Sequence, residues 1–267
     1  MTKTDPETLA YNREAWDRQV AEGDIWTRPV GAGVIEAARR GEWSAGLIGL
    51  QPTPRDWFPD EIAGLDVLCL ASGGGQQGPL LAAAGARVTV FDNSPAQLER
   101  DRTVSDTHDL GIETRLGDMA DLSAFSNESF DVVFHPVSNV FVPNVRPVWQ
   151  EAFRVLRPGG RLLAGFMNPA CFIFDYEIFE KTGERHVRYP VPFADARDLP
   201  PEELADIRER REPVTFGHTL ADQIGGQLEA GFQIVGFDEC ERGELEQQGP
   251  LEGYLATYIA TCAVKPG

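Results

Sequence analysis

The stretch from residue 67 to residue 75 limits the fold more than any other part of the sequence. The apolar run VLCLA leads directly into SGGG, and residues 76–84 have the composition of a helix. A buried strand that turns through glycines into a helix brings main-chain N–H groups and the positive end of the helix dipole next to the end of the strand. This arrangement is typical of α/β domains that bind a cofactor at the carboxyl ends of parallel strands.

Short apolar runs and longer amphipathic runs alternate along the middle of the chain, which predicts a parallel sheet covered by helices. The expected strands are 65–71, 86–92, 112–116, 130–135 and 160–167. The expected helices are 76–84, 95–110 and 145–156. Ser94 and Pro95 supply an N-cap and a first-turn proline for the second of these helices.

The last part of the chain predicts a helix followed by a hairpin. A capping box at Thr219 and Asp222 begins the helix, and Gly231 closes it. The apolar runs 232–239 and 254–264 come next, and the loop between them is too short for a helical crossover. We therefore expect these two strands to pair antiparallel.

Residues 1–60 and 168–216 do not follow the alternation. The first segment contains a predicted helix near 9–20, and the second contains many aromatic residues and a charged helix near 201–211. We expect both to cover the open end of the sheet, where α/β folds bind their ligands. The predicted organisation is an N-terminal helical cap segment, 1–60, and a catalytic domain, 61–267, with 168–216 as an insert in the substrate cap.

The spacing of Gly73, Gly75 and Gly78 matches the dinucleotide-binding fingerprint, and Asp92 ends the next predicted strand. A carboxylate at that place accepts hydrogen bonds from ribose hydroxyls, which both NAD and S-adenosylmethionine carry. These residues therefore predict a cofactor that contains adenosine, and they leave an NAD(P)-dependent oxidoreductase as an alternative.

Three further motifs distinguish the alternatives. LGDM at 116–119, FDVV at 130–133 and RVLRPGG at 154–160 accompany VLCLASGGG and VFDNSP. With them, the chain resembles the class I S-adenosylmethionine-dependent methyltransferases, particularly their broad bacterial small-molecule group, over about residues 60–167 and 219–264. The resemblance implies a Rossmann-like α/β fold with a seven-stranded, mostly parallel sheet of order 3-2-1-4-5-7-6. The last strand is antiparallel, and helices cover both faces.

The resemblance also implies the cofactor, S-adenosylmethionine, and the residues that bind it. Asp92 would hold the ribose, Asp118 would accept a hydrogen bond from the adenine amino group, and Met119 would pack near the ring. The implied cofactor-binding positions are Ala71, Gly73, Gly75, Asp92, Asn93, Asp118 and Met119. The chain departs from the family at Cys69, where an acidic residue is usual, and at Ala71, where glycine is usual. We expect Cys69 to be an inert buried thiol.

Methyl transfer needs mainly alignment of the acceptor, and a general base only for some acceptors. His135 is the candidate base, because it ends the fourth strand, where the family places residues that face the methyl group; a histidine bonded to the backbone is the alternative. The expected acceptor-binding residues are Tyr11, Ser138, Asn139 and Tyr176. Trp16 is expected beside the cofactor, and the insert offers an apolar pocket together with Arg185, His186 and Arg188 for an anionic group. We expect His108 and His218 at the surface or beside a helix cap.

The charge and the cysteine content of the chain limit the kinds of partner and site that it can have. The formal net charge of −18 disfavours nucleic acids and anionic membrane surfaces. The four cysteines are far apart in the sequence, which predicts neither a metal site nor a disulfide framework. The polar N-terminus and the lack of a long apolar run predict a cytoplasmic protein. The expected function is methyl transfer from S-adenosylmethionine to an O, N or S atom of a small-molecule acceptor, with a non-catalytic cofactor-binding protein as a further alternative. The sequence leaves the oligomeric state open.

Overall fold

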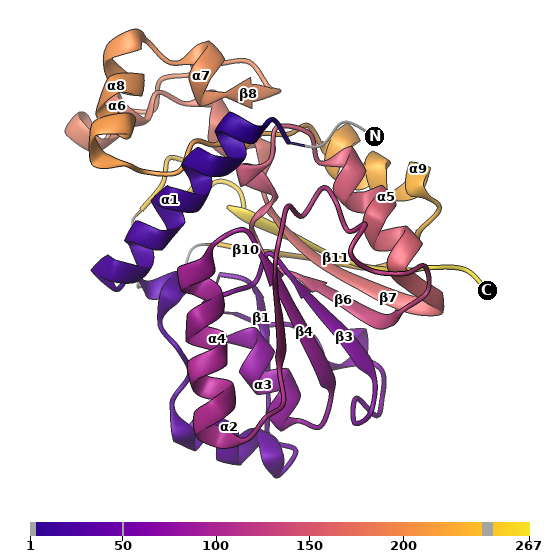
Figure 1. The fold of residues 1–267 in the computed structure, drawn as a ribbon. Helices are drawn as coiled ribbons and strands as arrows, with labels where there is room; N and C mark the ends of the chain where they lie inside the picture. Colours follow the sequence, from indigo (N-terminus) through magenta and orange to yellow (C-terminus); the bar gives the residue numbers. More distant parts are fainter. Residues whose placement is uncertain (1–3, 50, 242–247) are drawn as a thin grey trace.

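A computed structural model describes residues 4–49, 51–241 and 248–267. Its centre is a seven-stranded sheet of order β10-β11-β7-β6-β3-β4-β5 (Figure 1). The strands are β3 (Asp66–Leu70), β4 (Arg87–Asp92), β5 (Glu113–Leu116), β6 (Phe130–His135), β7 (Leu156–Met167), β10 (Gln233–Cys240) and β11 (Tyr258–Val264). Strands β3 to β7 pair in parallel, and β11 pairs antiparallel with both β7 and β10. The predicted strand order and the terminal hairpin are confirmed.

Strand β7 starts earlier than the sequence suggests. The motif RPGG at 157–160 was expected to be a turn before a strand at 160–167, but helix α5 (Arg146–Val155) passes directly into β7 at Leu156. The pairing with β6 shifts register between Phe130 and Val132, and Gly159 adopts a φ of +79°. The Pro-Gly-Gly segment is therefore an irregularity inside a long strand, because the neighbouring strands continue to pair on both sides of it.

Two helical layers cover the sheet, and the side chains of β3 alternate between them. Helices α2 (Ala32–Arg39), α3 (Gln77–Ala83) and α4 (Pro95–His108) lie on one face, and α5 and α9 (Gly226–Ala230) lie on the other (Figure 1). Val67 and Cys69 belong to the first hydrophobic cluster, whereas Leu68 and Leu70 belong to the second. Because β3 is buried on both faces, its sequence is a continuous apolar run, as parallel sheets require.

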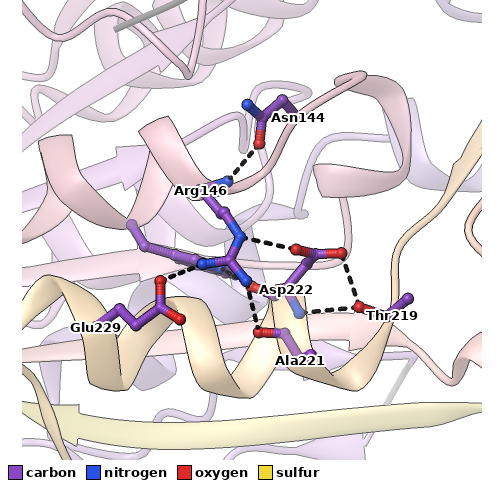
Figure 2. Close-up of polar contacts among 7 residues, drawn as sticks. Asn144, Arg146, Thr219, Ala221, Asp222 and Glu229 are labelled. Carbon is purple, nitrogen blue, oxygen red and sulfur yellow. Dashed lines mark hydrogen bonds and ion pairs between the residues drawn. The ribbon is translucent and has the colours of Figure 1, made fainter.

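Figure 2 shows the polar contacts that join α5 to the helix containing Asp222 and Glu229. Arg146 on α5 donates from Nε to Oδ1 of Asp222 over 2.8 Å and also pairs with Glu229 of α9. The N–H of Asp222 donates to Oγ1 of Thr219 over 3.1 Å, which confirms the predicted capping interaction. The helix begins with a π-helical turn, η5 (Ala221–Gly225), and ends at Gly231 with a φ of +109°.

The N-terminal segment contributes both to the ligand end and to the core. Helix α1 (Pro6–Glu22) packs on α4 and is followed by a 3-10 turn, η1 (Ile25–Thr27). The short strands β1 (Gly46–Ile48) and β2 (Gln51–Pro52) and the turn η2 (Arg55–Trp57) come after α2. Ile35, Leu47 and Phe58 are all buried in the first hydrophobic cluster. The division at residue 60 remains a proposal, and the parts on either side of it share this cluster.

Strand β1 lies directly on β7. At Gly165 of β7, a Cβ atom would come within 2.4 Å of the carbonyl oxygen of Leu47. Only glycine permits this approach, because any side chain would push the two strands apart.

The insert after β7 forms a small unit at one end of α1 (Figure 1). Its elements are η4 (Pro169–Ile173), α6 (Tyr176–Thr182), β8 (Phe193–Ala194), α7 (Asp195–Asp198), α8 (Pro201–Arg210) and β9 (Phe216–Gly217). Phe172 stacks on Phe193 with ring centroids 5.7 Å apart, and Tyr189 packs beside the same ring. These aromatic residues form the core of the insert. Across the described ranges, no helix has both the length and the apolar character that a bilayer span requires.

Candidate functional site

A cavity of about 340 Å³ lies at the carboxyl ends of the parallel strands. Its wall includes the glycine-rich turn after β3 and the segments that follow β4, β5 and β6. Helix α1, η1 and β1 supply the rest of the wall from the N-terminal part of the chain, and Met167 and Tyr258 close it beside β7 and β11. The cavity is therefore at the edge of the sheet where the sequence predicted the cofactor.

Two aspartate carboxyl groups of the chain accept hydrogen bonds from the backbone N–H groups of the glycine turn. The N–H of Gly73 donates to Oδ2 of Asp92 over 2.9 Å, and the N–H of Gly74 donates to Oδ2 of Asp101 over 2.9 Å. A phosphate placed at these amides would have to displace both carboxyl oxygens and would be repelled by the charge of Asp92. The turn is thus built to hold a carboxylate at Asp92 in position, rather than to bind a pyrophosphate.

The members of the predicted glycine motif have different positions. Ala71 and Gly73 line the cavity, as expected for the methionine end of the cofactor. Gly75 lies outside the wall, where a Cβ atom would meet Pro29 at 3.0 Å and the carbonyl of Arg100 at 3.2 Å. Its φ of +75° shows that Gly75 shapes the turn, since a left-handed conformation favours glycine.

Asp92 is the acid at the tip of β4. Besides the Gly73 amide, it accepts a hydrogen bond from the N–H of Ser94 at 2.9 Å. Burial raises the pKa of Asp92, and the hydrogen bonds from Ser94 and Gly73 oppose this shift. The carboxyl group lines the cavity and can accept further hydrogen bonds from a bound sugar.

Asn93 lines the cavity and also holds the N-terminal helix. Its side-chain amide donates to the carbonyl of Leu9 over 2.8 Å, and Arg13 donates to its backbone and side-chain oxygens at 3.0 and 3.2 Å. A bound adenine at this place would therefore contact the same residue that positions α1.

Asp118 and Met119 follow β5, the strand next to β4, and also line the cavity. Oδ2 of Asp118 accepts the backbone N–H of Thr4 at 3.1 Å, and Oδ1 accepts the N–H of Ala120 at 3.0 Å. At Gly117, a Cβ atom would lie 2.1 Å from the ring of Phe91, which also lines the cavity. Gly117 thus lets the chain pass flat over Phe91 and brings Asp118 to the cavity.

The structure corrects the expectation that His135 faces the transferred methyl group. His135 is fully buried, outside the cavity wall, and its ring packs edge-on against Trp149. Nδ1 lies 2.9 Å from the carbonyl oxygen of Leu70 and therefore carries the proton, while Nε2 is buried with no hydrogen-bond partner among the described residues. Burial lowers the pKa of His135 to about 4. The residue corresponds to the predicted alternative, a histidine bonded to the backbone at a strand end.

The expected acceptor residues are not brought together. Ser138 lines the cavity, where Oγ donates to the carbonyl of Pro136 over 2.9 Å. Asn139 is fully buried outside the wall, and its side chain donates to Gln223 over 3.0 Å. Tyr11 donates to the carbonyl of Glu212 over 2.9 Å and so ties α1 to the insert. Tyr176 begins α6 and is likewise outside the cavity wall.

The basic residues of the insert are paired away from the cavity, in contrast to the prediction that they receive an anionic group. Arg188 pairs with Asp175 and with Glu203, the latter at 3.1 Å. Arg185 lies over the rings of Phe179 and Tyr254 at 5.5 and 4.9 Å and donates to the carbonyl of Pro250.

His186 also differs from the expected arrangement, whereas His218 agrees with it in part. His186 pairs with Glu184 at 2.9 Å. His218 lies next to the helix-cap residue Thr219, as one of the two expected placements had it, and it is buried and bonds to the carbonyl of Asn139 at 3.0 Å. Its helix-capping neighbour Thr219 is where the sequence placed it.

Several wall residues were missed. Asn12 on α1 is buried, donates to the carbonyls of Phe141 and Val214, and accepts the N–H of Val214 at 2.9 Å. Trp16, which was predicted, packs edge-on against Phe141 with centroids 5.1 Å apart. Trp26 and Gln97 were not predicted. These residues reach the cavity through tertiary packing, and on their own helices they look like ordinary polar or apolar positions.

Asp101 is the most consequential residue that sequence reasoning missed. It is fully buried on α4, beneath the glycine turn, and its Oδ1 has no hydrogen-bond partner among the described residues. Burial, together with the charge of Asp101, raises the pKa of the Cys69 thiol, so the expected inert buried cysteine is confirmed. The carboxyl that accepts the Gly74 N–H comes from α4.

Comparisons with known proteins agree with this geometry. The family described as "Methyltransferase domain" matches residues 68–164. The chain is 50% identical over 257 residues to "Uncharacterized methyltransferase YbaJ" of Bacillus subtilis, which covers 96% of this chain and 98% of that protein. It is 31% identical over 130 residues to a "Ubiquinone biosynthesis O-methyltransferase" of Xanthomonas oryzae pv. oryzae, and the match spans about half of each chain, 47% and 54%.

The fold is also found in solved structures. An S-adenosylmethionine-dependent methyltransferase from Mesorhizobium loti superposes with a TM-score of 0.59 over 79% of this chain and 94% of that one, at 18% identity. At 18% identity, this structural similarity establishes the fold only. The family is established by the 50% identity to the Bacillus subtilis protein over nearly the whole chain. The chain belongs to the class I S-adenosylmethionine-dependent methyltransferases.

Proposed function

We propose that this enzyme transfers the methyl group of S-adenosylmethionine to an O, N or S atom of a small-molecule acceptor. The observation that carries the proposal is a single cavity with two chemically different ends. Asp118 and Met119 lie at the β5 side, and Met167 and Tyr258 lie at the β7 and β11 side. Its volume of about 340 Å³ is in the range of small-molecule sites.

The residues at the β4 and β5 side fit an adenosine group. Asp92 retains capacity to accept hydrogen bonds from ribose hydroxyls, and Asp118 can accept one from the adenine amino group. The carboxyl groups on the Gly73 and Gly74 amides disfavour a pyrophosphate, and this argues against the dinucleotide alternative. When bound, S-adenosylmethionine supplies a methyl group already activated on sulfur.

The chain itself would align the acceptor and exclude water. Trp16 and Phe141 form an aromatic pair in the wall, and α1 lines the cavity with Leu9, Asn12 and Trp16. Holding an acceptor in line with the methyl group can supply much of the rate enhancement without a covalent step. A formal net charge of −18 supports a small acceptor over a nucleic acid. All four cysteines are buried thiols, which supports the proposed cytoplasmic location.

Calorimetry and isotope transfer test this function. We expect S-adenosylmethionine and its demethylated product to bind and to raise the melting temperature, and NAD to do neither. Asp92→Asn should weaken binding of both by about tenfold to a hundredfold, because it removes charged hydrogen bonds to the ribose. Asp106→Asn, on the exposed face of α4, is the matched control and should bind like the wild type.

The acceptor class is tested with the same protein. Incubation of a cell extract with methyl-labelled S-adenosylmethionine should place the label in the small-molecule fraction. Label that enters only protein or nucleic acid would contradict the proposal, and so would a wild-type protein that binds NAD in preference to S-adenosylmethionine.

A further inference from the structure

We propose that the methyl acceptor is an uncharged, largely apolar molecule that reacts through a thiol sulfur. The inference rests on the proposed function and narrows it to one substrate class. It is drawn from the chemical character of the cavity wall at the β7 and β11 side, which we call the acceptor end. The acceptor end is formed by Leu47, Val137, Phe141, Met167 and Tyr258.

The acceptor end is apolar. Leu47 comes from β1, Val137 and Phe141 follow β6, and Met167 ends β7. Leu47 belongs to the hydrophobic cluster of the first layer, and Met167 packs against it. An acceptor that buries hydrocarbon against these side chains gains about 25 cal/mol for each Å² removed from water.

The wall offers no counter-charge to an anionic acceptor. Among the residues that the structure describes, the cavity wall contains no Lys, Arg or His, and its charged side chains are Asp92 and Asp118. The nearest basic cluster of the insert is held by its own acids, since Arg188 pairs with Asp175 and Glu203. A carboxylate or phosphate away from the reacting atom would therefore be desolvated without a partner and repelled by both aspartates, whereas a thiolate at the reacting atom faces the positive sulfonium of the donor.

Among its described residues, the wall also offers no side chain placed to act as a base on the acceptor. His135 carries its proton on Nδ1, toward Leu70, and its Nε2 lone pair lies in the core rather than in the cavity. Asp92 and Asp118 accept hydrogen bonds from main-chain N–H groups at the adenosine side.

The remaining polar groups at this part of the wall are hydroxyls and amides. Ser138 donates its hydroxyl hydrogen to the carbonyl of Pro136. Hydroxyls and amides form hydrogen bonds but do not remove a proton at neutral pH. The acceptor must therefore bring its own nucleophile.

Ordinary pKa values then rank the acceptors. A cysteine-like thiol with a pKa near 8.5 is about 3% thiolate at pH 7, whereas an alkylamine with a pKa near 10.4 is about 0.04% unprotonated. A simple alkanethiol has a pKa close to that of the amine, so its advantage over the amine rests on the greater nucleophilicity of the thiolate sulfur. An aliphatic alcohol is ionised far less than either, and its transfer needs a base. The thiol is the one of the three that supplies a strong nucleophile without help from the protein.

The step balances without any other reactant. The thiol loses its proton to water before it reacts, and the thiolate sulfur forms a bond to the methyl carbon. The bond between that carbon and the donor sulfur breaks, and its electron pair remains on the donor sulfur. The products are a neutral methyl thioether and a neutral donor thioether. Because an anion and a cation are converted into neutral groups, an apolar cavity favours this step.

A matched panel of six-carbon compounds tests the inference. The compounds are 1-hexanethiol, 1-hexanol, hexylamine and 6-mercaptohexanoate, with benzenethiol and phenol as an aromatic pair. Wild-type enzyme and S-adenosylmethionine are used, and methylated products are measured by mass spectrometry. Binding of each compound is measured separately by calorimetry in the presence of the demethylated donor, which permits no turnover.

We expect each thiol to be methylated at least tenfold faster than its alcohol and amine analogues, with a rate that rises about tenfold per pH unit below the pKa of the thiol. 1-Hexanethiol should bind at least tenfold more tightly than 6-mercaptohexanoate. Met167→Lys should reverse this preference, and Met167→Gln, the neutral control, should not. If the lysine variant does not fold, the relative binding of 1-hexanethiol and 6-mercaptohexanoate to the wild type tests the preference for an uncharged acceptor.

Faster methylation of an alcohol or amine, equal binding of 6-mercaptohexanoate, or no methylation of either thiol would overturn the inference. In each of these cases binding of S-adenosylmethionine would persist, and labelling of other small molecules in the extract would leave the proposed function intact. Failure of the donor to bind, or label only in macromolecules, would overturn both.

Discussion

Asp101 on α4 accepts a hydrogen bond from the backbone N–H of Gly74 at 2.9 Å, inside the protein and directly beneath the glycine-rich turn. The equivalent bond from Gly73 goes to Asp92, the acid on the cavity wall. Two consecutive amides of the turn are thus held by two carboxyl groups from different elements. One group faces the cavity, and the other is fully buried, so the turn depends on a residue that a cofactor does not touch.

Asp101 makes stability depend on pH. Burial raises the pKa of Asp101 to about 8, and the charge of Asp92 adds to the shift, against the hydrogen bonds from Gly75 and Gly74. The unfolded chain releases this proton near pH 4, as a free aspartate does. The folded state holds the proton more tightly, so the free energy of unfolding falls as pH rises between these values, by up to about 1.4 kcal/mol per pH unit.

Asp101→Asn should remove that part of the pH dependence, because the amide keeps an oxygen for Gly74 and has no proton to lose. Urea unfolding at pH 6, 7, 8 and 9 measures it, with Asp106→Asn as the control that keeps the wild-type slope. Parallel curves for the wild type and Asp101→Asn would show that the buried carboxyl does not titrate in this range.

The protein should be more stable with glycine in place of Ala71. Its φ of +46° lies in the left-handed region, which costs an L-residue about 1–2 kcal/mol. Glycine avoids that cost and loses about 0.5–1 kcal/mol through the greater freedom of the unfolded chain. We expect Ala71→Gly to raise the free energy of unfolding by up to about 1 kcal/mol without weakening S-adenosylmethionine binding. Ala205→Gly, on the exposed face of α8, should lower it by about 1 kcal/mol. A loss of stability in both variants would refute the assignment of strain at Ala71.

His135 should remain neutral through the physiological range. Its pKa is about 4 because the ring is buried, compared with about 6.5 in an unfolded chain. The unfolded state therefore takes up the proton more readily, and the free energy of unfolding falls as pH drops from about 6.5 toward 4.

Proton NMR of the imidazole resonances, assigned with His135→Gln, measures this directly. The resonance of His135 should not shift between pH 5.5 and 8, while the urea-unfolded protein titrates near pH 6.5. A midpoint near neutrality in the folded protein would restore His135 as a base.

Two adjacent glycines should respond in opposite directions to alanine. A Cβ atom at Gly226 would lie 2.7 Å from Trp149, whose ring is fully buried, whereas Gly225 has nothing within 4 Å. Gly226→Ala would displace Trp149 from its hydrogen bond to the carbonyl of Asp222 and should cost about 1–3 kcal/mol. Gly225→Ala should stabilise the helix by about 0.5–1 kcal/mol. Thermal unfolding of the pair checks the packing beside the Arg146 cluster of Figure 2, and equal effects of the two substitutions would contradict it.

The parts of the fold that the residues alone predicted are those that local pattern determines. The strands, the terminal hairpin and the cap at Thr219 follow from apolar runs, loop lengths and side chains close in the chain, whereas the strand order was implied by the family resemblance. Asp92 and Asp118 reach the cavity because each follows a strand, and the ends of parallel strands share one edge of the sheet.

The parts that sequence did not predict depend on packing between distant segments. Asp101 lies in a polar helix whose composition gives no sign that one carboxyl is buried. His135 ends its strand as predicted, but its ring turns into the core, and neither possibility is favoured by the strand pattern. The start of β7 was missed because Pro-Gly-Gly ordinarily ends an element, whereas here the strands on both sides hold it in the sheet.

The close passage of β1 over Gly165 has a consequence for engineering. Leu47 is both a wall of the acceptor end and a neighbour that β7 admits only by having no side chain at position 165. In the proposed acceptor end, substrate choice depends jointly on β1 and on β7. A chimera designed to take over the acceptor preference of this protein must therefore receive both β1 and a β7 strand with glycine at position 165. With β1 alone, a side chain on the host strand would keep Leu47 from its place in the wall.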